Sequence, residues 1–198
     1  MKLGVVHISS GEIFRSYIKK HDKLGEEIEK YVSQGNLVPD ELSIEIVKKR
    51  LEEPDVKNGA ILDGFPRTKK QAVVLEEFLK EKGEKIDIAV ELELSDEEII
   101  DRIVKRRTCT NKHCREIYNL EFKPPIQDGI CDKCESKLIQ REDDNEETVK
   151  NRLKNYHEIS YGLINFYKSK DVLYTVKLNN HSERTSSDVA KEIEEYLK

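Results

Sequence analysis

The chain has 198 residues, enough for one globular domain with a small insertion and a core of its own. Only 36% of the residues are hydrophobic and 38% are charged, but both signs are mixed and the net charge is −5, which indicates solvated helix faces rather than disorder. This mildly acidic balance argues against a nucleic-acid-binding protein. No apolar run is long enough to span a membrane or to form a signal-peptide core, so we expect a cytoplasmic protein without membrane association.

Short apolar runs alternate with amphipathic helices along the chain. The runs predict strands at residues 4–8, 59–62, 86–94 and 172–178. Helical spacing of apolar residues predicts helices that begin near Ser9, Leu24, Asp40, Thr68, Ser95, Asn145 and Val189. Residues 9–12 offer a capping start to the first helix. The helix from Ser95, which opens with a capping box, is expected to run to Arg107, and Gly35 is placed to end a helix. The alternation predicts an α/β domain with a mainly parallel sheet, interrupted by an insertion at 108–142.

Two segments lie where such a fold places its ligands. Open parallel sheets bind ligands beyond the carboxyl ends of their strands. Residues 9–11 follow the first predicted strand and residues 63–67 follow the second. We therefore expect the functional site at these segments.

All four cysteines fall within the insertion, in the pattern C-x4-C, sixteen residues, then C-x2-C: Cys109, Cys114, Cys131 and Cys134. Four thiolates fill a tetrahedral zinc site, and a disulfide scaffold would spread through a small secreted chain. The pattern therefore favours a structural zinc ion that holds together a segment too small for its own core. All-cysteine ligation is favoured, and a site of three cysteines with His113 stays open.

Seven arginines lie at or near the expected site: Arg15, Arg67, Arg102, Arg106, Arg107, Arg141 and Arg152. The guanidinium fork grips phosphate oxygens, and phosphoryl transfer asks a protein mainly for positioning and charge neutralisation. Any single arginine can equally be a surface residue, and for Arg107 the two interpretations have equal weight. Arg67 stands out because it follows a strand end, Gly64 and Pro66 in a rigid turn.

Other candidates have two interpretations. Asp63 is either a carboxylate that organises magnesium through water or a turn residue. The segment 141–144 either closes on phosphates or is a charged helix start. Tyr118 and Phe122 are either core residues of the insertion or base-stacking residues, and core is favoured for Phe122.

Together these residues resemble the adenylate kinase family in its zinc-bearing, long-lid form. The matching strings are HISSGE (7–12), GNLVPDE (35–41), LDGFPRT (62–68), DRIVKRR (101–107) and QREDD (140–144). The most specific is DGFPR followed by Gln71, and the resemblance covers essentially the whole chain. It implies a P-loop nucleoside monophosphate kinase-like parallel sheet with helices on both faces and a zinc-binding lid insertion.

The resemblance also implies a domain organisation and an activity. Residues 1–107 and 143–198 would form the core α/β domain, with an AMP-binding subdomain at 9–38 and a zinc-binding lid at 108–142. The chain would be a monomeric kinase of nucleotide biosynthesis that transfers a phosphoryl group reversibly from ATP to AMP, giving two ADP. Magnesium would accompany ATP, the zinc would be structural, and residues 9–38 and the lid would close to exclude water.

Roles carry over position by position. The residues implied to bind AMP are Ser10, Arg15, Asn36, Leu37, Val38, Gly64, Arg67, Gln71, Arg141 and Arg152. Those implied to bind ATP are Arg106, Ile117 and Tyr118. Those implied to act in catalysis are Arg67, Arg106, Arg141, Arg152 and Asp63, with Asp63 orienting magnesium. Gln71 would contact the adenine edge.

The chain departs from the family at its start. Residues 2–9 match only the tail of the helix that follows the family's Gly-rich loop, and no G-x-x-x-x-G-K string occurs in the 198 residues. The family's first strand lies at the centre of its sheet, so we expect unpaired strand edges, at roughly 1–3 kcal/mol for each buried orphan group. We expect an amino-terminally shortened form of a normal kinase with doubtful activity; the alternative is a genuine short protein with a rebuilt sheet.

Two other functions are compatible with parts of the pattern. A non-catalytic AMP-binding module would keep the AMP site and the zinc lid. A zinc-ribbon interaction protein would leave the match outside residues 108–142 unexplained. Among nucleoside monophosphate kinases, Gln71 and the long lid favour adenine over uracil or guanine. No role is assigned to residues 177–180, which depart from the family pattern.

Overall fold

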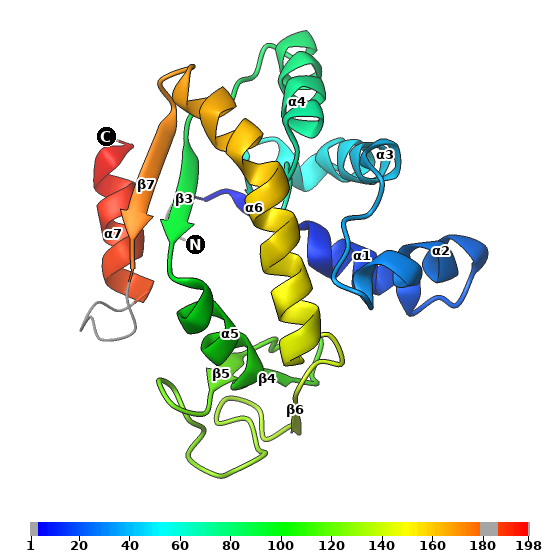
Figure 1. Cartoon of the computed structure of the whole chain (residues 1–198), viewed down its shortest axis with the longest axis vertical. Coiled ribbons are helices and arrows are strands. Elements are labelled where there is room, and N and C mark those ends of the chain that lie inside the picture. The colour runs from blue at the N-terminus through cyan, green and yellow to red at the C-terminus, as the bar shows by residue number, and fades with distance from the viewer. Residues whose placement is uncertain (1–3, 179–185, 198) are drawn as a thin grey trace. The chain divides into compact units, whose positions relative to one another are not determined.

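The computed structural model describes residues 4–178 and 186–197 (Figure 1). The chain divides into two compact units. Unit 1 comprises Met1–Val32, Asn36–Glu91 and Lys154–Thr175, and unit 2 comprises Ser33–Gly35, Leu92–Leu153 and Val176–Lys198. Asn179 and Asn180 lie outside the described residues. None of the helices in the described ranges is both long and apolar enough to cross a membrane.

Unit 1 contains the two strand ends at which the sequence predicts a site. Its elements are β1 (Val6–Ser9), α1 (Ser10–Ile18), α2 (Lys23–Val32), α3 (Asp40–Leu51), a short 3-10 helix (Pro54–Val56), β2 (Ala60–Asp63) and α4 (Lys69–Glu81). β1 and β2 are parallel, with Val6 opposite Ala60 and Ser9 opposite Asp63. The residues that follow both strands therefore leave the same sheet edge.

The helices α1 and α2 lie side by side (Figure 1). Gly25 of α2 is buried at this contact, and a Cβ atom added there would overlap the carbonyl oxygen of Tyr17 and lie 3.2 Å from the Cα of Ile18. Only a residue without a side chain allows this approach. Ile28, one turn further along α2, is fully buried in an apolar cluster with Val38.

A second apolar cluster joins α3 to α4. Val47 of α3 is 1% exposed and Leu75 of α4 is 2% exposed, and both pack with Phe65, Phe78 and Leu79. The N-cap of α4 is Thr68, whose hydroxyl accepts a hydrogen bond from the Gln71 amide. This core fixes the segment between β2 and α4, where the predicted site begins.

Unit 2 contains a small antiparallel sheet. Its elements include α5 (Asp96–Val104), β4 (Arg106–Cys109), β5 (Ile117–Asn119), β6 (Leu138–Ile139) and α7 (Ser186–Tyr196). β4 is the middle strand of the order β5–β4–β6, with Arg107 opposite Tyr118 and Cys109 opposite Leu138. The predicted capping box of Ser95 and Glu98 at the start of α5 is confirmed.

Three elements have residues in both units: β3 (Ala89–Glu93), α6 (Glu146–Lys168) and β7 (Leu173–Lys177). β3 and β7 pair in the same direction (Figure 1). The Ala89 amide donates to the Val172 carbonyl at 2.8 Å, and the Leu178 amide donates to the Glu93 carbonyl at 2.9 Å.

The predicted α/β class is confirmed, and the four predicted strands form two separate parallel pairs among the described residues, β1–β2 and β3–β7. Two local predictions are wrong. The helix after Ser95 ends at Val104 instead of Arg107, because the next residues pair as the strand β4. Ser9 precedes α1, but its side chain makes no capping hydrogen bond.

Candidate functional site

The turn after β2 is built around Gly64. Its φ of +75° lies in the region that favours glycine, and a Cβ atom there would lie 2.8 Å from Ser10 Oγ and 3.1 Å from an Arg67 guanidinium nitrogen. The Gly64 carbonyl accepts hydrogen bonds from Ser10 Oγ at 2.8 Å and from Arg67 Nε at 2.9 Å. The turn thus brings Ser10 and Arg67, predicted from distant strings, to one backbone group.

The first turn of α4 extends this cluster. Gln71 is 2% exposed, and its Oε1 accepts the Arg67 backbone N–H at 2.7 Å. Arg67 itself is exposed, so its guanidinium is held at the turn while it faces solvent. A cation fixed beside a buried carboxamide suits a ligand with a phosphate and a hydrogen-bonding ring edge.

The remaining AMP candidates of unit 1 lie on α1 and after α2. The guanidinium of Arg15 lies beside Gly11, where an added Cβ atom would be 3.3 Å from it. The segment 36–38 leaves α2 with the Asn36 amide donating to the Tyr31 carbonyl. Val38 is buried, and its carbonyl accepts a hydrogen bond from Ser43 Oγ at 3.1 Å, while Leu37 is half-buried.

Asp63 ends β2 with an exposed carboxylate. Its side chain is 61% exposed, and Oδ2 lies 3.4 Å from Nε2 of His7 on the neighbouring strand. An exposed carboxylate at the carboxyl end of a strand is available to a hydrated cation, the manner in which Mg²⁺ is commonly held.

Two predicted phosphate-binding arginines of unit 2 are paired with aspartates. Arg106 forms a bidentate ion pair with Asp144, in which Nε lies 2.9 Å from Oδ2. The Asp144 side chain is fully buried. Arg152 on α6 forms an ion pair with Asp143. Each carboxylate holds a guanidinium in a fixed place and balances its charge. Arg141, two residues before Asp143, is half-buried.

The other two arginines have structural contacts. Arg107 donates to the carbonyls of Val104, at 3.2 Å, and of Arg106, at 2.8 Å. The guanidinium of Arg102 lies over the Phe122 ring, 5.6 Å from its centroid. For Arg107 these contacts favour the structural interpretation.

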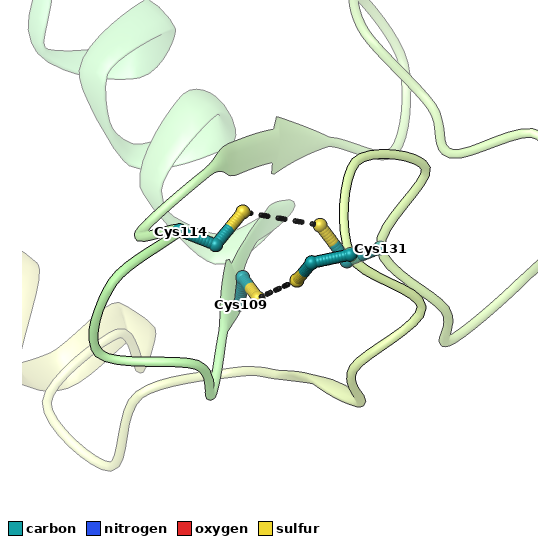
Figure 2. Close-up of side chains that lie close together, drawn as sticks. Cys109, Cys114 and Cys131 are labelled. Atoms are coloured by element: carbon teal, nitrogen blue, oxygen red, sulfur yellow. Dashed lines mark hydrogen bonds between the residues drawn. The ribbon is translucent and has the colours of Figure 1, made fainter.

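The four cysteines of the insertion converge on one point. Their sulfur atoms all lie within 4.8 Å of one another, and Figure 2 shows Cys109, Cys114 and Cys131 pointing toward one another. The Cys109–Cys134 sulfurs are 3.4 Å apart and the Cys114–Cys131 sulfurs 3.7 Å, too far for disulfides. His113 is exposed and is not part of the group.

This sulfur cluster fits a zinc ion. A zinc ion bound to four thiolates at about 2.3 Å holds them about 3.8 Å apart, close to both measured separations. A hydrogen bond from the Ser136 side chain lowers the pKa of Cys134 to about 6, which favours the thiolate that a metal requires. Burial raises the pKa of Cys109 to about 12, so this thiol ionises readily only beside a cation.

The two aromatic candidates of the insertion differ in burial: Tyr118 is buried and Phe122 is exposed. Tyr118 on β5 is 2% exposed, and its hydroxyl lies 3.5 Å from Cys131 Sγ and accepts the Asp132 amide at 2.8 Å. Phe122 is 46% exposed, so the core assignment favoured for it is wrong. Ile117 on the same strand as Tyr118 is exposed and remains available to a ligand, whereas the Tyr118 ring belongs to the sulfur cluster.

Asp40 belongs to this site although no sequence pattern predicted it. Its carboxylate accepts hydrogen bonds from Thr68 and from the Gln71 side chain. The available signal was an acidic residue after Pro39 at a helix start, which indicates only a helix terminus.

Comparison with known proteins identifies the family. A family model described as adenylate kinase matches residues 1–172. Curated proteins named adenylate kinase are similar to the chain: one from Acetivibrio thermocellus is 46% identical over 192 residues, covering 97% of this chain and 86% of its own length. One from Caldicellulosiruptor saccharolyticus is 45% identical over 190 residues, covering 96% and 87%.

A third, from Streptomyces avermitilis, is 44% identical over 174 residues, covering 88% of this chain and 79% of its own length. The match extends over the strand-end turn, the arginine segments and the cysteine insertion. The α/β architecture agrees with the nucleoside monophosphate kinase fold. The chain belongs to the adenylate kinase family of phosphotransferases.

Proposed function

We propose that this chain binds AMP through unit 1 and takes part in reversible phosphoryl transfer from ATP to AMP, giving two ADP. The observation that carries the proposal is the turn around Gly64, where one carbonyl accepts hydrogen bonds from both Ser10 and Arg67. Arg67 and Arg15 bind the AMP phosphate, and Gln71 contacts the adenine edge. The backbone of residues 36–38 lines the base pocket.

Arg106, Arg141 and Arg152 neutralise the transferring phosphoryl group. Their permanent charge suits this role, since phosphoryl transfer places charge on the equatorial oxygens. Asp143 and Asp144 hold two of these guanidinium groups in place before any nucleotide binds. Adenylate kinases use magnesium with ATP; in this chain Asp63 would hold the ion through water, and the ion would supply charge neutralisation at the phosphates. Ile117 contributes to the ATP base site.

The zinc ion is structural. Four cysteine ligands would fill all four positions of a tetrahedral site and leave none for water or substrate. Its contribution is therefore to order residues 108–142.

A second candidate is AMP binding without turnover. It is favoured by the absence of a G-x-x-x-x-G-K string from the 198 residues, because the backbone amides and lysine of that loop cradle the ATP phosphates. Both candidates share the AMP site and differ only in the assay of ADP formation.

The test uses the purified 198-residue chain. AMP is titrated by calorimetry, and ADP formation is measured with ATP, AMP and magnesium. Arg67→Lys should weaken AMP binding by about tenfold or more, because lysine lacks the planar fork. Arg50→Lys, at a half-buried arginine of unit 1 paired with Asp55, is the matched control and should leave AMP binding unchanged.

ADP formation with AMP binding selects the kinase, and AMP binding alone selects the second candidate. If the folded, zinc-loaded chain does not bind AMP, both candidate functions are contradicted and a zinc-ribbon interaction protein is favoured.

A further inference from the structure

The carboxamide of Gln71 is held at both ends by protein groups. Gln71 is 2% exposed at the start of α4. Its Oε1 accepts the Arg67 backbone N–H at 2.7 Å, and its Nε2 donates to Asp40 Oδ1 at 2.8 Å. All these residues belong to unit 1.

Only one orientation of this carboxamide satisfies its neighbours. A backbone amide can only donate and a carboxylate can only accept, so a flipped Gln71 would place N–H against N–H and oxygen against oxygen. The nitrogen and oxygen positions of Gln71 are therefore dictated by the chemistry of its partners.

Thr68 reinforces the same orientation. Its hydroxyl accepts the Gln71 backbone N–H at 3.1 Å, so its own hydrogen is free to donate to Asp40, whose two oxygens both lie at 3.1 Å. Asp40 thus receives hydrogen bonds from Thr68 and from Gln71 at once. Charge-assisted hydrogen bonds of this kind are stronger than neutral ones.

We propose that Asp40 is a positioning residue that sets the nucleobase selectivity of the AMP site by locking the Gln71 carboxamide. This inference rests on the proposed function. In the locked state Nε2 keeps one hydrogen and Oε1 keeps one lone pair. That pair matches adenine, which presents a donor at N6 and an acceptor at N1. A 6-oxopurine presents an acceptor and a donor in the reverse order, and the lock prevents Gln71 from flipping to match it.

The rival interpretation is that Asp40 only ties α3 to α4. Glu41 provides the comparison, because it is the next residue, also carries a carboxylate in the first turn of α3, and reaches α4 through an ion pair with Lys70. The side-chain partner of Glu41 is Lys70, whereas that of the Gln71 carboxamide nitrogen is Asp40, so Glu41 tests charge and tethering without the lock.

The experiment is titration of AMP and of IMP, which differ only in the N6 amino or O6 group and the N1 hydrogen, against four forms of the 198-residue chain. These are the wild type, Asp40→Ala, Asp40→Asn and Glu41→Ala. The readout is the ratio of the two dissociation constants. This ratio does not change if a variant is partly unfolded, because both ligands lose the same fraction of competent protein.

We expect Asp40→Ala to reduce the preference for AMP over IMP by about tenfold, the effect of one charge-assisted hydrogen bond. Asp40→Asn should retain most of the preference, because its amide oxygen still accepts from Gln71, and Glu41→Ala should retain all of it. Asp40→Ala with an unchanged ratio would overturn the inference and leave the proposed function standing. A wild type that binds AMP and IMP equally would do the same, whereas a wild type that binds neither would overturn both.

Discussion

In unit 1 two clusters of apolar side chains fill the space between the helices, whereas in residues 108–142 of unit 2 the buried cluster consists of sulfur atoms and their neighbours. Ile28, Val47 and Leu75 are each at most 2% exposed in the first case. In the second, the buried members are Cys109, Tyr118, Cys131 and Leu138, with Cys114 and Cys134 packed against them.

The two arrangements draw their stability from different sources. Burial of a leucine or isoleucine contributes about 1.5–3 kcal/mol and depends on the chain alone. Four clustered thiols contribute little by themselves, but a structural zinc ion bound to such a set supplies about 10–16 kcal/mol in small peptides. Unit 1 should therefore be insensitive to metal, and residues 108–142 should depend on it.

Metal removal should have the largest effect, because it should disorder residues 108–142 and leave unit 1 folded. With a zinc chelator, amide hydrogen exchange should rise by orders of magnitude across residues 108–142, because the segment then has too small a core to stay ordered. Amides of α3 and α4 in unit 1 should keep their protection. Hydrogen exchange read by mass spectrometry measures both in one sample.

Substitutions identify the ligands in the same assay. Cys131→Ser should reproduce the effect of the chelator, whereas His113→Ala should bind one zinc ion with unchanged protection, because His113 lies outside the sulfur cluster. Protection of residues 108–142 that survives metal removal would show that the segment folds without an ion.

The second test weakens the apolar side of the comparison. Leu75→Ala removes a side chain that is 2% exposed in the α3–α4 cluster and should lower the free energy of unfolding of unit 1 by about 2–5 kcal/mol. Urea titration, with and without chelator, should give the same loss in both conditions. Ile61→Ala is the control, since Ile61 is 42% exposed and its truncation should cost less than about 1 kcal/mol.

The smallest expected effect comes from removing one ion pair of unit 1. Arg50 forms a two-pronged ion pair with Asp55, at 2.9 and 2.7 Å, and this contact holds the pKa of Asp55 below its ordinary value of 3.8. A carboxyl group whose pKa is lower in the folded state stabilises the fold at pH values above its unfolded-state pKa. This stability is lost as the pH falls through its folded-state pKa. Urea midpoints at pH 6 and pH 3 should therefore differ less in Asp55→Asn than in the wild type.

Arg50→Met should remove the same pH-dependent increment, and the double variant should add nothing to it. An Asp55→Asn variant with the full wild-type pH dependence would show that the pair contributes nothing in solution, as for many exposed pairs.

Features with a short-range cause could be predicted from the sequence. The capping box joins Ser95 and Glu98, which lie three positions apart in one helix turn, and Gly35 has the positive φ expected after a helix. The convergence of the cysteines also follows from their spacing, because a common ion requires it. The alternation of short apolar runs with amphipathic helices is also a local pattern, and it predicted the α/β class.

Features that depend on long-range contacts could not be predicted. Asp40 meets Thr68 and Gln71 across 28 and 31 residues, so no local pattern contains the pairing. β5 has only three residues, too few for an alternation that would distinguish the buried Tyr118 from its exposed neighbours. The ion pair of Arg106 with Asp144 spans 38 residues and arises from the fold.

The contact between α1 and α2 has a consequence for how the chain tolerates change. At position 25 the essential feature is the absence of atoms, because any side chain would occupy the space of the Tyr17 carbonyl. In a deep mutational scan, position 25 should therefore be as intolerant as Ile28, although it contributes no apolar surface. A space that must stay empty between two backbones constrains the sequence as strongly as a buried side chain.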